Sequence, residues 1–379
     1  MDHLAPTIAD DELLALLGKV LQTNPTPQST GELRLRFFQP GFSWQALVDL
    51  SVAHEVLPPL VFALNQRALL PPVPTALSEH ARTAHVTNRL AVAYQQHLNR
   101  LADLREQLKV ALGALNGEGV VPVLLKGAVH LTLAQPEWHQ ARGMRDLDIL
   151  VSAAEADSAN RALSALGYRP DADPPPLDRH LPELWLPGHA GTVELHIEAL
   201  SFPARHALTT EEVWRHAEAG SFAGAAYRAL PPEWHLLHGM LHHQLADHGH
   251  ARRMLAIKGL WEFSRVGADI SPRGWRAIIE HAEQRGILDV LSSWAVQAKR
   301  LFGLDIPRDL CASAAGRKHA EATFRRARAP YKFRQVASTI DRLRFAFSRE
   351  TLAMRYGRDR SLSRAGLHHF LFLVRRYRK

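Results

Sequence analysis

The residues best suited to chemistry in this sequence are two aspartates, Asp146 and Asp148, in the segment Asp-Leu-Asp-Ile-Leu-Val. The alternation of polar and apolar residues predicts a β-strand, in which successive side chains point to opposite faces. Both carboxylates would then project from one face, while the apolar residues enter a core. Two carboxylates on one strand face provide half of a Mg²⁺ site, because Mg²⁺ prefers oxygen ligands.

A second alternating segment, Thr-Val-Glu-Leu-His-Ile-Glu at 192–198, predicts another strand that presents carboxylates. If the two strands are neighbours in one sheet, Glu194 joins the two aspartates in a site for one or two Mg²⁺ ions, with Mn²⁺ as an alternative. Such ions also bind substrate phosphates. His196 shares the face of Glu194, so it either contacts the substrate or is a hydrogen-bonded structural histidine.

Lys126 and Gly127 follow an apolar segment at 120–125 that predicts a strand, and a helical turn follows them. Backbone N–H groups and a positive charge at such a turn could hold a phosphate. Arg142, four residues before Asp146, is placed to contact the same phosphate group or another phosphate of a nucleoside triphosphate. The alternatives are that Lys126 is a solvated charge and that Arg142 forms a structural ion pair with one aspartate. The combined residues suggest in-line attack of an acceptor hydroxyl on the α-phosphorus of a nucleotide, with pyrophosphate leaving.

The elements that must position these residues divide the chain into several units, because 379 residues exceed what one compact core usually holds. An apolar stripe from Leu90 to Leu112 predicts a long helix, a capping box at 152–155 opens another, and helical periodicity resumes beyond residue 205. We therefore expect an α+β fold with a small mixed sheet. Its units are a helical N-terminal region (1–112), an α+β core that carries the acids (113–204), a larger helical C-terminal domain (205–316) and a basic helical tail (317–379).

Composition narrows the class of protein. Hydrophobic residues make up 46% and charged residues 22% of the chain, which is typical of a soluble globular protein. Cys311 is the only cysteine, which excludes an intrachain disulfide and a cysteine metal cluster, and its position in a helical region argues against a thiol nucleophile. The acidic start of the chain and the lack of an apolar run of about 18 residues predict a cytoplasmic protein. Motifs of dinucleotide-binding, P-loop, serine hydrolase and zinc protease families are missing from the sequence.

A histidine-rich segment follows Pro232 and has two interpretations. His235, His238 and His242 fall on one helix face, with His243 beside them, so a zinc site is one alternative. Structural zinc sites usually take ligands from more than one element, and no cysteine is nearby. A helix that lines the nucleotide cleft is the favoured interpretation, with His238 and His242 as candidate contacts.

The charge of the chain is concentrated at its C-terminal end, where residues 317–379 contain 18 Lys and Arg against 4 Asp and Glu. These side chains could bind the phosphates of a nucleic acid. Alternatively, the apolar segment 367–374 and the arginines after it could contact an anionic membrane surface. A third interpretation is that they cover helices facing the acidic remainder of the protein. The nucleic-acid alternative concerns Arg325, Arg326, Arg328, Lys332, Arg334, Arg342, Arg344 and Arg349.

Taken together, these motifs resemble those of a known bacterial family, the "uncharacterised nucleotidyltransferase" family of the DNA polymerase β-like nucleotidyltransferase superfamily. The resemblance covers roughly residues 40–300 and rests on Leu125-Lys-Gly-Ala128, Arg142, Asp146-Leu-Asp148, Gly167-Tyr168 and Val193-Glu-Leu-His196. Superfamily members share a Gly-Ser turn, an Asp-x-Asp strand and a third acid, and they bind Mg²⁺ and a nucleoside triphosphate. The resemblance implies that Asp146 and Asp148 are metal ligands and that Glu194 is the third carboxylate and a candidate base.

The resemblance also implies an activity, the transfer of a nucleoside monophosphate to an acceptor hydroxyl. The acceptor could be a small molecule, a peptide or RNA. A non-catalytic nucleotide- or partner-binding protein and a transferase with another nucleotide-activated donor are the alternatives. The chain departs from the superfamily pattern at Ala128, where a phosphate-contacting Ser is usual, at Glu194, where Asp is commoner, and in the 19 positions between Gly127 and Asp146.

Overall fold

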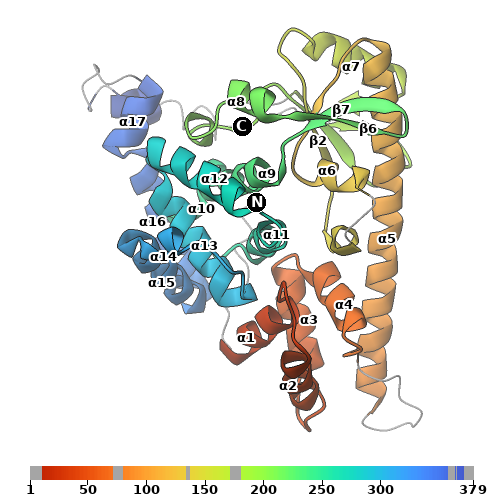
Figure 1. Ribbon diagram of the computed structural model, residues 1–379, viewed down its shortest axis with the longest axis vertical. Helices are drawn as coiled ribbons and strands as arrows, with labels where there is room; N and C mark the ends of the chain where they lie inside the picture. The colour runs from red at the N-terminus through yellow and green to blue at the C-terminus, as the bar shows by residue number, and fades with distance from the viewer. Residues whose placement is uncertain are drawn as a thin grey trace.

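The structure is a computed structural model that describes residues 11–70, 80–133, 137–170, 181–356, 363 and 365–370. Its described part contains one seven-stranded mixed sheet and many helices, which confirms the predicted α+β class. In Figure 1 the sheet lies beside the long helix α5, and the N-terminal and C-terminal helices pack together next to it.

Four short helices precede α5: α1 (Asp11–Val20), α2 (Pro27–Phe37), α3 (Trp44–Ala53) and α4 (Leu57–Gln66). The Pro-, Ser- and Gly-containing segment 24–31 is typical of a connector in sequence, yet α2 begins within it. Thr26 caps this helix. The Thr26 side chain accepts a hydrogen bond from the backbone N–H of Ser29, the Ser29 hydroxyl accepts one in return, and a proline occupies the first turn.

The predicted long helix is α5 (His80–Gly117). Its buried residues Leu104, Leu108 and Leu112 pack in one core with Leu147 and Ile149 of the sheet. α7 (Ala156–Ala165) belongs to the same core, and the predicted Ser152–Glu155 capping bonds are present just before it. This core covers one face of the sheet. The aspartate-bearing face of the sheet is therefore opposite α5.

The sheet has the strand order β3-β4-β5-β2-β1-β7-β6. β1 pairs antiparallel with β2 and parallel with β7, and β2 pairs parallel with β5. Of the strand predicted at 120–125, only two residues form β1. The bounds are β1 (Val123–Leu124), β2 (Asp146–Leu150), β3 (Arg169–Pro170), β4 (Leu184–Trp185), β5 (Thr192–His196), β6 (Glu218–Phe222) and β7 (Ala225–Ala229).

Residues 218–229 form the hairpin β6–β7, so the expectation of continuous helix beyond residue 205 is wrong there. The two turn residues, Ala223 and Gly224, both have positive φ (51° and 85°). This conformation matches the twist of a two-residue hairpin. The Asn116 side chain, at the end of α5, donates a hydrogen bond to the carbonyl of Ala226 and accepts one from its N–H. The hairpin thereby extends the sheet beyond the predicted core.

Most of the helices after residue 203 share one core with α1–α4, which includes Leu17, Trp261 and Phe302. The predicted boundaries of the N-terminal and C-terminal regions stay a prediction. No described helix is long and apolar enough to cross a bilayer. The helices are α6 (Lys126–Thr132), η1 (Glu137–Ala141), η2 (Ala204–His206), α8 (Thr210–His216), α9 (Pro232–Leu241), η3 (His242–Ala246), α10 (Gly249–Arg252), α11 (Ile257–Gly267), α12 (Pro272–Gln284), α13 (Leu288–Phe302), α14 (Arg308–Ala312), α15 (Ala314–Arg328), α16 (Tyr331–Ala346) and α17 (Arg349–Tyr356).

Candidate active site

The parallel pairing of β2 with β5 brings the predicted acids together. In its register, Asp148 lies opposite Glu194, and Asp146 lies opposite Thr192. Asp148 is 1% exposed, Glu194 8% and His196 0%. Among the described residues, Asp148, Glu194 and His196 form one of two groups whose possible ligand atoms all lie within 4.8 Å of one another. Asp146 lies outside this tight group, nearer the opening of the site.

Asp148 accepts two hydrogen bonds at one oxygen. Lys126 Nζ lies 2.6 Å and His196 Nε2 2.9 Å from its Oδ1. Burial alone would raise the pKa of Asp148, but the Lys126 charge and the His196 hydrogen bond outweigh it and hold the pKa well below its usual range. Asp148 is therefore an ionised carboxylate even though it is buried.

Glu194 is also close to His196. Its Oε2 lies 3.3 Å from His196 Nε2, the atom that bonds Asp148, and this buried oxygen has no hydrogen-bond partner. Burial opposes ionisation, yet the pKa of Glu194 falls to about 2, chiefly through its interaction with His196. A buried, ionised oxygen without a donor is costly to keep in a protein interior.

Asp146 is in the opposite electrostatic situation. Burial, together with the negative charges of Asp148 and Glu194, raises its pKa. Asp146 and Asp148 line a cavity of about 230 Å³, whereas Glu194 and His196 do not line it. The other walls come from the loop before β2 and from α9, η3 and α11. The sheet thus supplies the negative charge, and the helical part of the protein encloses it.

The β1–α6 junction places Lys126 over the acids. Lys126 has φ +45°, a left-handed conformation that costs a non-glycine residue about 1–3 kcal/mol. The unusual backbone conformation coincides with a lysine whose side chain is directed at the site. Gly127 is buried and does not line the cavity. A Cβ there would come within 2.1 Å of Arg142 Nη1, so glycine lets the guanidinium pack on the turn. The predicted contact of Gly127 with phosphate stays a prediction.

Arg142 is 8% exposed and does not pair with either aspartate. Its Nη2 lies 3.2 Å from Glu262 Oε2 on α11, and its Nε has no hydrogen-bond partner. The structural ion pair that the sequence suggested therefore exists with a different acid. Arg142 still lines the cavity, so a substrate role is compatible with its position.

Sequence reasoning missed several residues of this cavity: Glu55, Arg145, Lys258 and Glu262. Lys258 Nζ pairs with Glu55 at 3.2 Å, and Arg145 lies 3.6 Å from the same carboxylate. These residues come from the turn after α3, from α11 and from the loop before β2. Nothing in their local sequence pattern signals a site. Only the packing of distant helices against the sheet brings them together.

The histidine-rich helix lies over the cavity, but its histidines have different roles. His238 directs Nε2 to the Ala199 carbonyl at 3.1 Å, so this candidate is structural. His235 and His242 line the cavity, and His242 begins the π-helical turn η3. Burial lowers the pKa of His235 to about 4 and that of His242 to about 4, so both are neutral at pH 7. The metal-competent group on this helix is His242, His243 and Asp247, not the predicted set of three.

A second cavity, of about 370 Å³, shares His235 with the first. It is lined by His130, Trp138 and His139, and the His130 ring lies 4.5 Å from His139 and 5.1 Å from His235, measured between ring centroids. Burial is the main reason that the pKa of each of these three histidines is lowered. They form an uncharged wall beside the carboxylate cavity.

The acids fit a divalent cation. Asp146, Asp148 and Glu194 offer hard oxygen donors, Glu194 Oε2 has no hydrogen-bond partner, and burial, together with the negative charges of Asp148 and Glu194, raises the pKa of Asp146. His196 is occupied by its hydrogen bond to Asp148 and is suited to orienting it. Oxygen donors of this kind are the ligands that Mg²⁺ prefers in proteins.

A mixed sheet that presents acids on two parallel strands, with a lysine at the preceding strand–helix turn, defines an α+β protein with a buried carboxylate site. The comparison with family profiles agrees, because residues 40–303 match the family described as "Uncharacterised nucleotidyltransferase". The chain belongs to this family, as the motifs predicted. The match supports nucleotidyl transfer as the general activity. Neither the comparison with curated proteins nor that with solved structures found a match.

Proposed function

We propose that the protein is an enzyme that transfers a nucleoside monophosphate from a nucleoside triphosphate to an acceptor hydroxyl. The observation that carries this proposal is the register of β2 and β5, which places Asp148 opposite Glu194 with Lys126 on the shared face. Asp146, Asp148 and Glu194 would hold Mg²⁺, or Mn²⁺ in its place. When bound, the ion neutralises phosphate charge and polarises the α-phosphorus.

The protein's own residues account for the remaining requirements. Lys126 and Arg145 supply positive charge at the cavity for the triphosphate, and Arg142 is held at its wall by Glu262. The acceptor oxygen bonds to the α-phosphorus as the bond to the bridging oxygen breaks. Pyrophosphate leaves with the bonding electrons, and a base takes up the hydroxyl proton. Because its pKa is about 2, Glu194 suits a ligand better than a base.

The enzyme is tested by incubating it with Mg²⁺, each of the four triphosphates and a cell extract, and by measuring pyrophosphate and a labelled product. We expect Asp148→Asn to lower turnover by a factor on the order of 10²–10³. Asp157→Asn, an exposed change on α7, is the matched control and should leave turnover unchanged. Circular dichroism and a melting curve establish that each variant is folded.

Calorimetry with Mg²⁺ and each triphosphate separates an enzyme from a binding protein that keeps the fold. Binding without turnover in any extract would support the non-catalytic alternative. Turnover that is the same in Asp146→Asn, Asp148→Asn and the native protein would refute the proposed site.

A further inference from the structure

The second cavity, of about 370 Å³, lies next to the carboxylate cavity, because His235 lines both. Its walls come from α6, η1, the hairpin β6–β7, α9, α11 and the segments beside them. Its volume falls within the range of roughly 300–1,000 Å³ that is typical of small-molecule sites. Five side chains of its described lining carry aromatic rings, so we call it the aromatic pocket: His130, Trp138, His139, Tyr227 and His235.

His130 and His139 indicate that the aromatic pocket takes a polar ligand. His130 is 7% exposed, and neither of its buried nitrogens has a hydrogen-bond partner among the described residues. The buried Nδ1 of His139 has none either. Buried polar atoms are normally hydrogen-bonded, and a ring that only filled space could be phenylalanine. Burial lowers the pKa of both histidines, so each ring is neutral at pH 7 and offers one donor and one acceptor.

Tyr227 and Trp138 give the aromatic pocket fixed flat surfaces. Tyr227 pairs with Gly220 across the hairpin, and a Cβ at Gly220 would come within 2.6 Å of the Tyr227 ring. Glycine therefore lets the ring lie against the neighbouring strand, and the Tyr227 hydroxyl lies 2.9 Å from Thr132 Oγ1 of α6. Trp138 contacts Trp261 edge-on, at 5.7 Å between ring centroids. Nucleobases stack on preformed aromatic surfaces of this kind and hydrogen-bond along their edges.

Charge distinguishes the aromatic pocket from the carboxylate cavity. The charged side chains of its described lining are two acids, Glu218 and Asp269, which do not attract a phosphate. The carboxylate cavity, by contrast, is lined by Lys126, Arg142 and Arg145 as well as by its acids. A nucleotide has the same two parts, because it joins a charged phosphate chain to an uncharged heteroaromatic base. The two adjacent cavities therefore match the two ends of one nucleotide.

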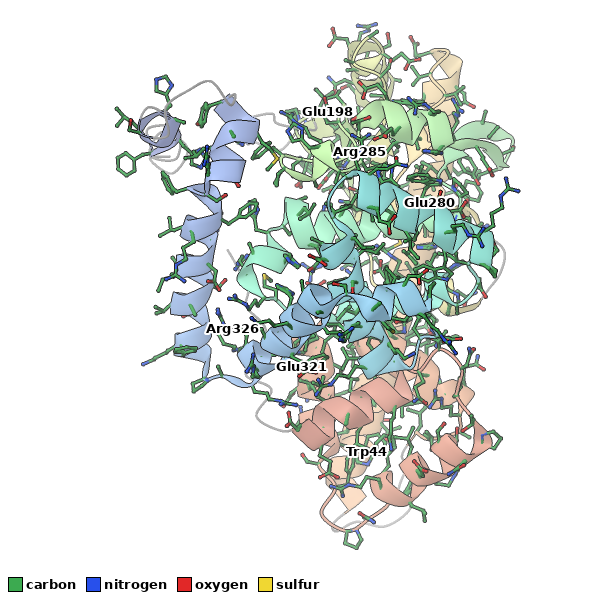
Figure 2. All side chains as sticks on the ribbon, turned by 60° about the vertical axis from the view of Figure 1, so that its left-hand side comes forward. Trp44, Glu198, Glu280, Arg285, Glu321 and Arg326 are labelled. Carbon is green, nitrogen blue, oxygen red and sulfur yellow. The ribbon has the colours of Figure 1, made fainter. Side chains whose placement is uncertain are left out.

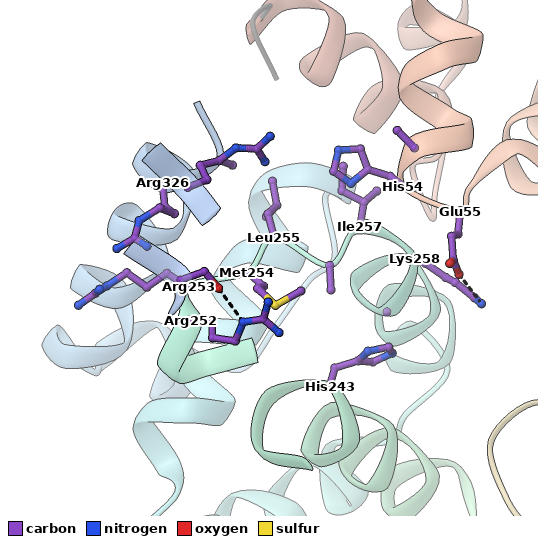
Figure 3. Close-up of a pocket in the computed structure, with 16 residues that line it drawn as sticks. His54, Glu55, His243, Arg252, Arg253, Met254, Leu255, Ile257, Lys258 and Arg326 are labelled. Carbon is purple, nitrogen blue, oxygen red and sulfur yellow. Dashed lines mark hydrogen bonds and ion pairs between the residues drawn. The ribbon is translucent and has the colours of Figure 1, made fainter. Parts of the chain in front are cut away.

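A third cavity, of about 230 Å³, adjoins the carboxylate cavity at Glu55, His243 and Lys258. Figure 3 shows it with Glu55 and Lys258 at one end and Arg326 toward the other. Figure 2 shows α16 along the side of the molecule, with Arg326 near it. We call this cavity the basic pocket, because its lining includes five bases: Arg252, Arg253, Lys258, Arg326 and Arg334.

The basic pocket is less suited to a nucleobase than the aromatic pocket. Lys258 pairs with Glu55, and Arg253 and Arg326 share one oxygen of Asp341 at 3.0 and 2.9 Å. These cations make contacts within the protein. The described lining of the basic pocket contains no Trp, Tyr or Phe on which a base could stack.

We propose that the aromatic pocket binds the nucleobase of the nucleoside triphosphate whose phosphates occupy the carboxylate cavity. Trp138 and Tyr227 supply the surfaces on which the base stacks, and His130 and His139 hydrogen-bond to its edge. The ribose passes His235, which lies in the wall of both cavities. This inference rests on the nucleotidyl transfer proposed above, because the triphosphate donor is taken from that proposal.

Calorimetric titration with two kinds of Mg²⁺-bound ligand tests the inference. One kind is the four nucleoside triphosphates, and the other is inorganic tripolyphosphate, which has a chain of three phosphates but no base. We expect His130→Phe and His139→Phe each to weaken binding of the tightest nucleoside triphosphate about tenfold, because the ring remains while its hydrogen bonds to the base are lost. Tripolyphosphate should bind both variants as it binds the native protein.

His206→Phe is the matched control, since His206 is exposed and lines neither cavity. This variant should bind both kinds of ligand like the native protein. Melting curves check that each variant is folded. If His130→Phe fails to fold, His139→Phe decides, because His139 is only half-buried.

Three results would overturn the inference. Equal weakening of both kinds of ligand would mean that the histidines act only by supporting the carboxylate cavity. Unchanged binding in both variants, or no binding of any triphosphate, would remove the base from the aromatic pocket. Binding of a free nucleoside in the presence of saturating Mg²⁺ and triphosphate, with loss of that binding in His130→Phe, would assign the pocket to the acceptor.

The inference and the proposed function can fail separately. If triphosphate binding depends on the two histidines as expected but no extract supports turnover, the proposed function fails while the aromatic pocket remains a nucleobase site. If the native protein transfers nucleotides and the two variants bind the triphosphate equally well, the inference fails while the proposed function stands.

Discussion

The carboxylate cavity and the basic pocket both contain a lysine paired with a carboxylate, but the two pairs differ in their surroundings. Lys126 and Asp148 are 2.6 Å apart, with side chains 17% and 2% exposed. Lys258 and Glu55 are 3.2 Å apart, with side chains 26% and 52% exposed. The first pair joins the start of α6 to strand β2 and is buried, whereas the second joins α11 to the turn after α3 and is partly exposed. The comparison teaches that the acidic site is fixed by the strand register and that the basic pocket depends on helix packing.

The strongest test of this difference replaces each lysine with methionine. Lys126→Met leaves buried, ionised acids without their cation, so the free energy of unfolding should fall by about 3–5 kcal/mol. Lys258→Met removes the partner of Glu55, which is half exposed, so the free energy of unfolding should fall by less than about 1 kcal/mol. Urea unfolding in the presence of a chelator measures both, and added Mg²⁺ should recover part of the Lys126→Met loss. Equal losses in the two variants would show that the cavities do not differ in this way.

The packing of Arg142 on Gly127 gives a smaller expected effect. In Gly127→Ala the new Cβ would meet Arg142 Nη1 at 2.1 Å and Met144 Cε at 2.8 Å. The guanidinium must move away from Glu262, so we expect a loss of about 1–3 kcal/mol in the free energy of unfolding. Gly113→Ala, on the open surface of α5 with nothing within 4 Å, is the control and should gain about 0.5–1 kcal/mol. A stable Gly127→Ala protein would show that Arg142 is free to move.

Two buried, neutral histidines, His238 and His54, predict that the free energy of unfolding depends on pH. The pKa of His238 is lowered to about 3 and that of His54 to about 4, mainly by burial. Between pH 6.5 and about 4 the unfolded chain binds protons at these positions and the folded protein does not. Stability is therefore full above pH 6.5 and falls with pH, by up to about 1.4 kcal/mol per pH unit for each histidine.

Replacing either histidine checks this effect. His238→Asn and His54→Asn should each reduce the dependence of the unfolding free energy on pH between 6.5 and 4, as measured by urea unfolding. The lowered pKa values of Asp148 and Glu194 contribute stability that is present above their unfolded pKa near 4 and is lost only at lower pH. An unchanged slope in both histidine variants would mean that these rings already bind protons in the folded state.

The smallest effect concerns Ala128, where superfamily members usually have a phosphate-contacting serine. Ala128 is 0% exposed and lies in the core that α5 forms with the sheet. Ala128→Ser would bury a hydroxyl there, so we expect a loss of about 1 kcal/mol and no gain in triphosphate affinity. Calorimetry and urea unfolding measure the two quantities. Tighter triphosphate binding by the variant would place residue 128 in the substrate site after all.

The sequence by itself determined the strands that carry chemistry. Alternation in a strand has a period of two, so Asp146, Asp148 and Glu194 could be assigned to the strand faces opposite the apolar core without knowledge of the fold. The α+β class, the long helix α5, the family and the lysine beside the acids followed from local patterns of the same kind. Each of these features depends on residues close together in the chain.

Only the tertiary structure decided the features that join residues far apart in the sequence. The hairpin β6–β7 completes the sheet through pairing with β1, and Glu262 reaches Arg142 only because α11 packs against the segment that precedes β2. The basic pocket joins α3, α10, α15 and α16, and nothing in the arginine-rich sequence of residues 317–379 shows that Arg326 and Arg334 turn inward while Arg328 pairs with Asp11. Local periodicity fixes the face on which a side chain lies, but the packing of elements far apart in sequence fixes what that face meets.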